Sequence, residues 1–420
     1  MNNRKYIFTA NEYAVIVYCF LLLSATSFLN FNFGIFIKPL ESEFQWSRTS
    51  ISSAYSIYMI IGSFAAILTG ELSDRYGAQK IILIGMLLSG LSLFLASTLH
   101  SIWEFYFYIG VLAGLSRSAL NTPIFAYIQK TFDYKRGLAT GIAGSGGGLG
   151  ILVITPVVGY LIIHYGWRPS YVVLSSVFFI LSIPTLVFIF LSRKNQESLD
   201  TQESTPEENV LSESTQGMKV IMKHRSFWSI LGSHSCDCIC HSVIIVHLVP
   251  FAIESGVPRL EAATLLGMIG LGALIGRIAA GIISDRIGAK WALFISLTCQ
   301  TLPVPLLLFN PNFTSLLFVA SLVGLGLGGH GTMYPIVTRD YYGKKRVGIL
   351  FGTFATGASL GMATGSFLGG VIHDLTGTYH AAFLFSFIFG ACSLLLVWLY
   401  PEKNKLKPAK KEKTEFALNT

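Results

Sequence analysis

Residues 271–290 read LGALIGRIAAGIISDRIGAK, an apolar, glycine-rich segment that ends in a polar turn. Arg277 interrupts the apolar part eight residues before Asp285, which corresponds to about 12 Å along a helix. If the turn lies at a membrane surface, the guanidinium group lies deep in the hydrocarbon layer. A charge at that depth is costly and indicates a functional site. We therefore expect Arg277 to bind a substrate.

The composition of the whole chain is that of a membrane protein. Of its 420 residues, 52% are hydrophobic and 12% are charged, about half the charged fraction of a typical soluble domain. The net charge of +8 does not indicate nucleic-acid binding, because lysine and arginine occur in short loops and in the C-terminal tail. All six cysteines lie in apolar segments, so no disulfide framework is expected. Nothing indicates a cofactor.

The apolar segments predict an all-α polytopic membrane protein with twelve transmembrane helices. Most lysines and arginines fall on one side of the predicted membrane, which places both termini in the cytoplasm by the positive-inside rule. We expect a monomer in the plasma membrane, surrounded by the lipid bilayer. The predicted helices cover residues 13–38, 51–70, 79–98, 102–129, 138–163, 169–192, 226–253, 261–284, 289–309, 312–337, 347–372 and 379–400.

A polar, acidic segment divides the helices into two groups of six. This segment, 193–225, is poor in apolar residues and is expected to be a cytoplasmic linker without a fold of its own. Residues 1–192 then form an N-terminal six-helix bundle and residues 226–400 a C-terminal one. Residues 401–420 form a basic cytoplasmic tail, which either keeps the chain soluble or contacts anionic lipid headgroups.

The two halves carry the same sequence pattern at a constant spacing. GELSDRYG at 70–77 matches GIISDRIG at 281–288, an offset of 211 residues, and the same offset takes Gly141 to Gly352. Two motifs that share one offset indicate that each half is a copy of one six-helix unit. Transporters use such internal repeats.

The repeated turn predicts a tight connection between two helices. Its glycines permit the reversal, its aspartate can cap a helix N-terminus, and its arginine can bind a carboxylate or a helix C-terminus. The turn is either a structural hairpin or a cytoplasmic latch that opens during transport, and the two roles are compatible. The residues that we assign to this gating motif are Gly70, Asp74, Arg75, Gly77, Asp285, Arg286 and Gly288.

The glycine run at 137–150, GLATGIAGSGGGLG, invites comparison with a phosphate-binding loop. No strand precedes it, so the context of a nucleotide-binding loop is missing. Small residues at helical spacing instead allow two membrane helices to approach closely. We expect close helix packing here.

With these features the chain resembles the major facilitator superfamily. GELSDRYGAQK after the second helix is similar to the best-known signature of that family. Three stretches resemble its monocarboxylate and oxalate/formate transporter branch: FNFGIFIKPLESEFQWSRTSIS, TFDYKRGLATGIAGSGGGLG and GRIAAGIISDRIG. The resemblance implies a fold of two pseudo-symmetric six-helix bundles. It also implies that Arg277 anchors a carboxylate.

Two departures from the branch bear on ion coupling. The proton-coupled lactate carriers have an aspartate one turn before the helix 8 arginine, where this chain has Ala273. The oxalate/formate exchangers use a lysine on helix 11, and residues 351–372 contain none. Neither coupling scheme carries over intact.

Four ionisable residues lie deep in predicted helices: Arg117, Asp237, Arg277 and His330. In the superfamily their helices border the cavity between the halves. Two arginines beside a cavity favour an anionic substrate, because a guanidinium group holds a carboxylate through two hydrogen bonds. Alternatively, Asp237 pairs permanently with one arginine and stabilises the bundle.

The candidate ligands of the anion are Arg277 and Arg117, with Asn32, Asn121 and His330 as polar candidates. Asp237 and His330 are the candidates for carrying a coupled proton.

Residues 234–241 read HSCDCICH, which are residue types that bind metals. Alternate residues on a helix point about 200° apart and cannot converge on one ion. Only pairs four residues apart, such as Asp237 and His241, share a face. We therefore expect these side chains to pack in the bundle, and we predict no metal site.

Together these features predict a secondary active transporter of small organic anions, with monocarboxylates as the favoured substrates and a proton as the co-substrate. The alternatives are a carboxylate exchanger and an efflux transporter of another small molecule, for which an acidic, aromatic cavity would be typical. An enzyme or a sensor would require a catalytic cluster or a folded soluble domain, and the sequence indicates neither. We predict that the protein is not an enzyme.

Overall fold

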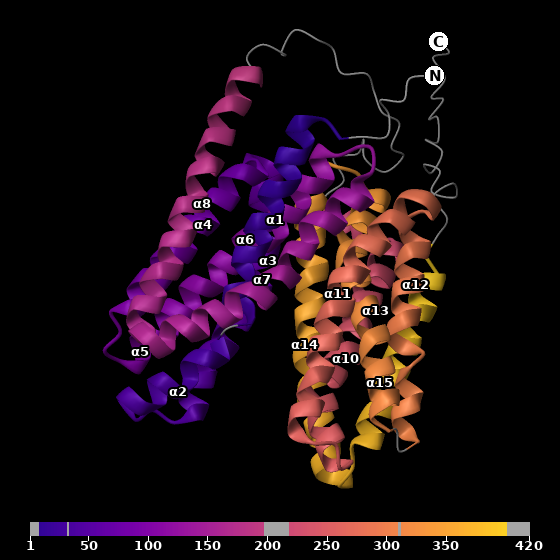
Figure 1. Cartoon of the computed structure of the whole chain (residues 1–420). Coiled ribbons are helices and arrows are strands. Elements are labelled where there is room, and N and C mark those ends of the chain that lie inside the picture. Colours follow the sequence, from indigo (N-terminus) through magenta and orange to yellow (C-terminus); the bar gives the residue numbers. More distant parts are fainter. Residues whose placement is uncertain (1–7, 32, 197–217, 310–311, 401–420) are drawn as a thin grey trace, which may run out of the picture.

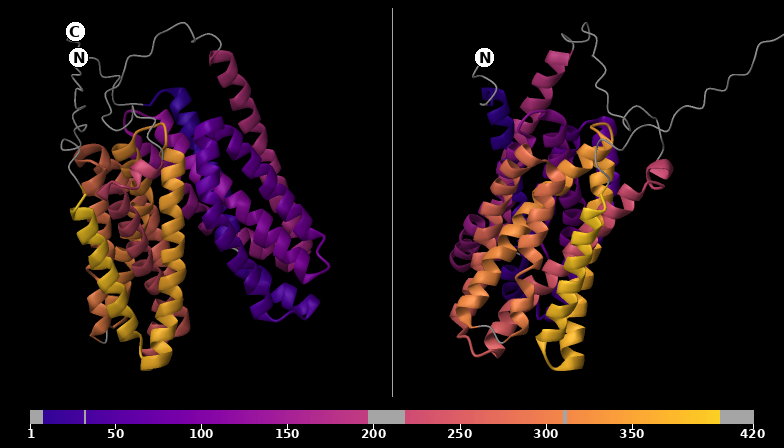
Figure 2. Two further views of the ribbon diagram at one scale, coloured as in Figure 1. Left: turned by 180° about the vertical axis from the view of Figure 1, so that it is seen from behind. Right: turned by 90° about the vertical axis from the view of Figure 1, so that its right-hand side faces the viewer.

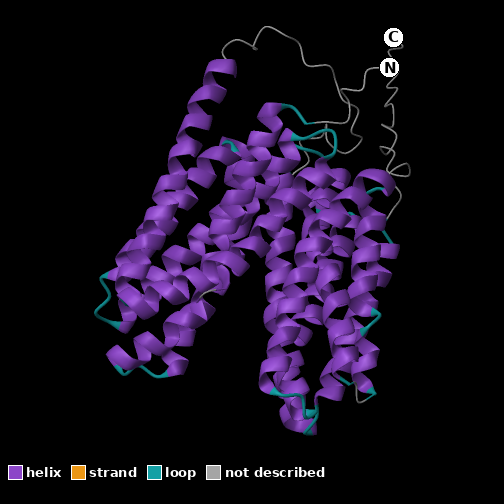
Figure 3. Cartoon of the chain, in the orientation of Figure 1, coloured by secondary structure: helices purple, strands orange, loops and turns teal. Residues whose placement is uncertain are grey.

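The computed structural model describes residues 8–31, 33–196, 218–309 and 312–400. Within these ranges the chain is helical and contains no strand (Figure 3). The first half consists of α1 (Ala10–Phe31), α2 (Phe33–Phe44), α3 (Arg48–Tyr76), α4 (Ala78–Ser97), α5 (Ile102–Phe105), the π-helix η2 (Tyr106–Leu112), α6 (Ala113–Thr131), α7 (Arg136–Tyr165) and α8 (Trp167–Gln196).

The second half consists of α10 (Arg225–Glu254), α11 (Arg259–Ile287), α12 (Ala289–Thr301), the 3₁₀ helix η3 (Val304–Leu308), α13 (Phe313–Tyr342), α14 (Val347–Thr376) and α15 (Tyr379–Trp398). Between the halves lies the short helix α9 (Met218–Ile221). The segment α5–η2–α6 runs without a break, as the single predicted helix at 102–129 requires, so each half has six long helical segments among the described residues. Ten helices are long and apolar enough to cross a membrane, judged by length and composition over the described residues.

The two halves form two bundles that converge at one end and diverge at the other (Figures 1 and 2). At the end where they meet lie the turns after α3, α6, α11 and α13, and we call it the closed end. The opposite end, where α2 and α5 lie, is called the open end. Between the bundles, α3 packs against α14 and α7 packs against α11.

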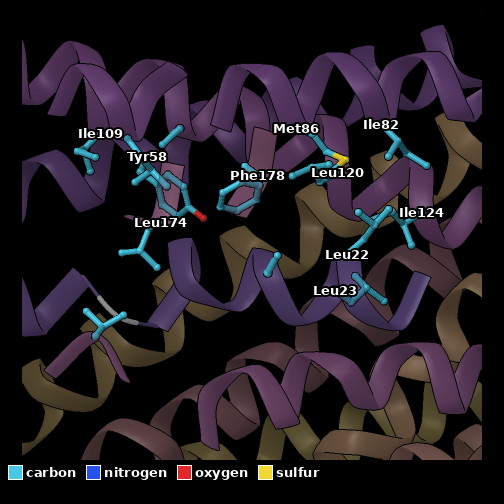
Figure 4. Packing of buried hydrophobic residues seen from close by; sticks show 14 of the residues in the cluster. Leu22, Leu23, Tyr58, Ile82, Met86, Ile109, Leu120, Ile124, Leu174 and Phe178 are labelled. Atoms are coloured by element: carbon cyan, nitrogen blue, oxygen red, sulfur yellow. The ribbon is translucent and has the colours of Figure 1, made fainter. Parts of the chain in front are cut away.

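Each bundle has its own buried apolar core. In the first bundle the core combines side chains from α1, α3, α4, α6 and α8. Figure 4 labels ten members of this core: Leu22, Leu23, Tyr58, Ile82, Met86, Ile109, Leu120, Ile124, Leu174 and Phe178. In the second bundle, one apolar cluster lies around Tyr334 and another around Ile244. Each bundle is therefore packed internally around a core of its own.

The repeated turns adopt the tight geometry that their sequence predicts. Gly77 separates α3 from α4 with a φ of +94°, and Gly288 separates α11 from α12 with a φ of +90°. Residues with a side chain rarely adopt positive φ. A glycine at each position therefore allows the two helices to be joined by a single residue.

Glycines also set the distance between the bundles near the closed end. Gly70 of α3 meets the backbone of Gly348 of α14, and Gly137 of α7 meets the backbone of Gly281 of α11. A β-carbon added at any of these four positions would collide with the main chain of the other bundle. The two crossings are related by the offset of 211 residues. The glycine run therefore packs helices on two sides, because Gly137 and Gly141 meet α11 of the opposite bundle and Gly146 and Gly150 meet α1 of the same bundle.

Some predicted boundaries differ from the structure. The predicted helix at 13–38 is two helices, with α2 (Phe33–Phe44) lying separately at the open end. The predicted helix at 289–309 loses its α-helical form at Thr301, because Pro303 and Pro305 follow. The predicted linker, 193–225, includes the end of α8 and the helix α9. The remainder of the linker, 197–217, and the tail, 401–420, lie outside the described residues.

One ion pair fixes α2 at the open end. Arg168, at the start of α8, donates to Glu43, which also accepts a hydrogen bond of 2.6 Å from the indole nitrogen of Trp167. The bond from Arg168 lowers the pKa of Glu43 below its usual range. A depressed pKa means that the pair stabilises the fold above the unfolded-state pKa of about 4.3. This contribution is lost as the pH falls through the lower folded-state value.

We therefore expect acid to destabilise the wild-type protein more than a Glu43→Gln variant. The melting temperatures of both proteins in detergent, measured from about pH 7 down to about pH 3, check this prediction. The gap between the two proteins should be widest at neutral pH and should shrink below about pH 4. Other carboxylates titrate equally in both proteins, so the difference isolates Glu43. A gap that does not change with pH would contradict the prediction.

Candidate functional site

A cavity of about 270 Å³ lies between the two bundles. Seven helices line it: α1, α3, α6 and α7 from the first bundle, and α11, α13 and α14 from the second. Its charged lining residues among the described part of the chain are Arg117 and Arg277, one from each bundle. The other lining residues are Leu23, Thr26, Ser27, Tyr55, Met59, Asn121, Phe125, Gly144, Gly147, Gly331, Thr332 and Met362.

Arg277 reaches across from α11 to the glycine run of α7. Its guanidinium group donates a hydrogen bond to the carbonyl of Gly144 and lies over Gly147, where an added β-carbon would be 2.8 Å from Nη1. Glycine at position 147 thus leaves the space that the guanidinium group occupies. A guanidinium group has five N–H donors, so a contact to one carbonyl leaves donors for an anion in the cavity.

The backbone of α7 is unusually accessible along this wall. Ser24 of α1 donates to the carbonyl of Gly146 at 2.9 Å, and Ser27 donates to that of Gly147 at 2.7 Å. With Arg277 on Gly144, three side chains bind carbonyls within four residues of one helix. The absence of side chains on α7 permits these contacts. The glycine run therefore also shapes the cavity, a role that sequence reasoning missed.

Arg117 lies on the opposite wall. Its guanidinium carbon is 5.8 Å from the ring centre of Tyr58, which is buried in the first bundle. An added β-carbon at Gly62 would lie 3.2 Å from Nη1 of Arg117, so Gly62 makes room for this side chain. The π-helix η2 precedes α6 directly, and such segments are frequent next to functional sites. Arg117 therefore packs against the ring of the buried Tyr58 and lines the cavity.

The structure brings only part of the predicted anion site together. Arg277, Arg117 and Asn121 line the same cavity. His330 is buried behind the cavity wall, although its neighbours Gly331 and Thr332 belong to the lining. Asn32 lies outside the described residues. Sequence reasoning missed the apolar and hydroxyl members of the lining, because nothing in an apolar helix marks which face borders a cavity.

Asp237 of α10 lies buried inside the second bundle, between α12 and α13. It accepts a hydrogen bond from Gln300 of α12, and its Oδ2 is 3.5 Å from Nε2 of His330. The expected alternative pairing of Asp237 with an arginine is not found among the described residues, because Asp237 faces α12 and α13 whereas Arg277 faces α7. The roles of Asp237 and His330 as proton carriers stay predictions.

At the closed end, the aspartates of the two repeated turns hold the opposite bundle. Asp74 accepts the backbone N–H groups of Gly348 and Ile349, at 3.0 and 2.8 Å. These groups belong to the first turn of α14, where the helix dipole favours a negative charge. Lys130 of the same bundle approaches Asp74 to 2.6 Å.

Asp285 makes the equivalent contacts from the second bundle to the first. It accepts the N–H groups of Gly137 and Leu138 in the first turn of α7, both at 2.8 Å. All three residues correspond to those of the Asp74 contact at the offset of 211. The two contacts, which we call the paired latch (Asp74 with Gly348 and Ile349, Asp285 with Gly137 and Leu138), thus follow the repeat.

Three ion pairs add to the closure of this end. Asp133, in the turn before α7, binds both Arg339 and Lys344 of the second bundle, and Arg136 binds Asp340. Desolvation works to raise the pKa of Asp133, but the bonds from Lys344 and Arg339 outweigh it and lower the pKa. Asp133 and Lys344 occupy equivalent positions of the repeat. Their opposite charges, visible in the sequence at the offset of 211, were a signal that sequence reasoning missed.

Comparison with known proteins gives one family. The family model of the Major Facilitator Superfamily matches residues 19–284 and 233–419. The chain is 26% identical to monocarboxylate transporter 13 of Rattus norvegicus, over 84% of this chain and 80% of the relative. It is 26% identical to monocarboxylate transporter 12 of Homo sapiens, over 90% of this chain and 79% of the relative.

Solved structures agree in fold. The crystal structure of FucP, a transporter of the same superfamily in the outward conformation, has a TM-score of 0.74, with 12% sequence identity. That comparison covers 93% of this chain and 98% of FucP. The proton:xylose symporter XylE also has a TM-score of 0.74, at 13% identity, and covers 94% of this chain. At these identities the likeness concerns the fold alone.

Proposed function

Because the chain belongs to the Major Facilitator Superfamily, we propose that it moves small organic anions, monocarboxylates first among them, across a membrane by alternating access. The chain is a multi-pass membrane protein and a transporter of a small molecule. The single observation that carries the proposal is the cavity between the bundles, with an arginine on each wall. The names of the curated relatives favour monocarboxylates over other anions.

The charge of the lining supports an anionic substrate. No carboxylate lines the cavity in the described part of the chain, so the charged side chains that a bound anion meets in this lining are both positive. A carboxylate fits the planar guanidinium group through two parallel hydrogen bonds. The same lining argues against efflux of a cationic compound, which would need an acidic residue to replace lost hydration. The cavity volume of about 270 Å³ suits a small molecule.

The closed end supports alternating access. The paired latch and the ion pairs around Asp133 block one side of the cavity, while the bundles diverge on the other side (Figure 1). We place the closed end and both termini in the cytoplasm, since lysines and arginines gather there. The structure then corresponds to a carrier open to the outside. We further propose that the carrier works as a monomer in the plasma membrane.

Uptake into proteoliposomes tests the proposal. The purified protein is reconstituted and supplied with labelled lactate, pyruvate, formate or oxalate, with protein-free liposomes as the control. We expect saturable uptake of at least one monocarboxylate that the unlabelled compound competes away. An acidic outside medium should increase this uptake if a proton moves with the anion. Absence of transport for all four compounds would reject the anion proposal. An uptake rate that does not change with a pH gradient would reject the proton as co-substrate.

Exchange is a second candidate function, favoured by one observation. The cavity holds two positive charges with no carboxylate in its described lining. Reorientation of the two buried arginines is less costly when a bound anion compensates their charge. An obligatory exchanger would therefore bind a second anion before it returns to its first orientation. Internal unlabelled substrate should then accelerate the entry of labelled substrate by several-fold. Equal rates with and without internal substrate would leave net uptake as the mode of transport.

A further inference from the structure

Four side chains that bind metals converge inside the second bundle. Asp237, Cys238 and His241 come from α10, and His330 comes from α13. One ligand atom from each lies within 4.8 Å of the others. We propose that these four residues form a binding site for one zinc ion. The site is separate from the anion cavity and does not depend on the proposed function.

The sequence argument against a metal site considered α10 alone. Asp237 and His241 are four residues apart and share a face, and Cys238 borders that face. The fourth ligand, His330, lies 89 positions further along the chain and arrives only when α13 packs against α10. Helical periodicity cannot reveal a ligand on another helix, which is why the sequence predicted packing instead.

The four side chains are buried with bonding capacity unused. Their exposed fractions are 1% for Asp237, 2% for Cys238, 2% for His241 and 6% for His330. Oδ2 of Asp237, Nδ1 of His241 and Nδ1 of His330 have no hydrogen-bond partner among the described residues. Buried polar atoms are normally satisfied, so three exceptions in one cluster require an explanation. A shared cation would satisfy the Asp237 carboxylate and would take one nitrogen from each imidazole ring.

The donor set matches the chemistry of zinc. Two imidazole nitrogens, one thiolate and one carboxylate oxygen are all established zinc ligands, and structural sites are four-coordinate. Zn²⁺ with one thiolate and one carboxylate carries no net charge, which suits a site buried among apolar helices. A tetrahedral site requires ligand atoms roughly 3.3–3.8 Å apart. The present ligand atoms, within 4.8 Å of one another, would have to approach by about 1 Å to reach this spacing, through changes in the side-chain torsion angles of Cys238 and the histidines.

The surroundings orient the ligands as in known metal sites. Gln300 donates to Oδ1 of Asp237, which holds the carboxylate and leaves Oδ2 directed at His330. The rings of His241 and His330 lie 5.0 Å apart, between centroids. Partners of this kind fix ligand orientation and are nearly as important as the ligands. Zinc binding displaces the proton of the Cys238 thiol, which passes to the solvent.

A bound zinc ion would connect α10 to the segment of α13 that borders the cavity. His330 directly precedes Gly331 and Thr332 in the cavity lining. Metal binding would therefore fix the position of that part of the cavity wall. Zinc at this site would also exclude the predicted proton-carrier role, because Asp237 and His330 would be metal ligands.

The metal content of the purified full-length protein tests the proposal. The protein is prepared without chelators, loaded with one equivalent of zinc, desalted and measured by mass spectrometry of the metal. We expect about one zinc per chain in the wild type, and background levels in Cys238→Ser and His241→Gln. The matched control is Cys236→Ser, which removes a thiol from the same helix outside the cluster and should keep the metal.

Cobalt provides a second readout that does not depend on variants folding correctly. Co²⁺ bound by the wild-type protein should show the intense visible absorption of a tetrahedral site together with a thiolate-to-cobalt charge-transfer band. Zinc should remove both signals in competition. The proposal is overturned if the wild type retains no more zinc than Cys238→Ser, or if cobalt shows no thiolate band. Neither outcome touches the anion proposal, whose test is transport.

Discussion

Replacing Arg277 by lysine is expected to lower carboxylate uptake about 100-fold. Lysine keeps the positive charge but cannot form two parallel hydrogen bonds with a carboxylate. A charge-assisted bidentate contact is worth roughly 3 kcal/mol, and each 1.4 kcal/mol corresponds to about a factor of ten. Initial rates of labelled lactate or pyruvate uptake in proteoliposomes give the measurement. Arg277→Ala should lose transport completely, because the charge is removed as well.

The control for this prediction is Arg168→Lys, which changes an arginine at the open end and away from the cavity. It should transport at close to the wild-type rate. Arg277 also bonds the Gly144 carbonyl of the other bundle, so a slow variant requires a second measurement. If the KM of the variant rises while the populations of its conformations stay those of the wild type, the lower transport rate results from weaker anion binding. Full activity of Arg277→Lys would contradict the assignment of this residue as the anion ligand.

Removing both aspartates of the paired latch is expected to open the closed end. Asparagine keeps the shape of the side chain but loses the charge that two helix N-termini attract. We assign about 1.5 kcal/mol to each carboxylate, so Asp74→Asn or Asp285→Asn alone should shift the conformational equilibrium about tenfold. The two sites lie in separate contacts, so the double variant should shift it about 100-fold.

Distances between spin labels report this opening. Labels at cysteines replacing Lys80 and Lys345, which are exposed on opposite bundles at the closed end, should move apart in the double variant. The background protein carries Cys392→Ser, because Cys392 is exposed. Glu71→Gln, which neutralises a carboxylate three residues before Asp74, serves as the matched control and should leave the distance unchanged. An unchanged distance in the double variant would rule out a latch function.

The sequence predicted the fold because its two strongest signals are global. Apolar segments of about 20 residues with few charges are typical of membrane helices, and an offset shared by distant motifs indicates two copies of one unit. The turn residues Gly77 and Gly288 were predicted from local chemistry, since glycine permits a tight reversal between two helices. The α12 boundary was misjudged at Thr301, because apolarity alone does not distinguish an α-helix from a proline-containing 3₁₀ turn.

The candidate site was harder to predict, and the reason is physical. In a soluble helix the polar face indicates the exposed side, but a membrane helix is apolar towards lipid and core alike. Arg277, Arg117 and Asn121 stood out because polar residues are rare at this depth. His330 stood out equally, yet it faces α10 instead of the cavity. Depth can be read from a sequence, whereas the direction of a side chain around its helix axis cannot.

The four glycines where the bundles cross carry a consequence of their own. Gly70 and Gly348 touch at one crossing, and Gly137 and Gly281 touch at the other. None of them lines the cavity in the described structure, so a bulkier residue would act as a wedge between the bundles and leave the anion ligands intact. The resting orientation of the carrier and the intrinsic affinity of its anion site are thereby separate properties. A glycine-to-alanine change at one of these crossings would therefore alter the resting orientation and leave the anion site unchanged.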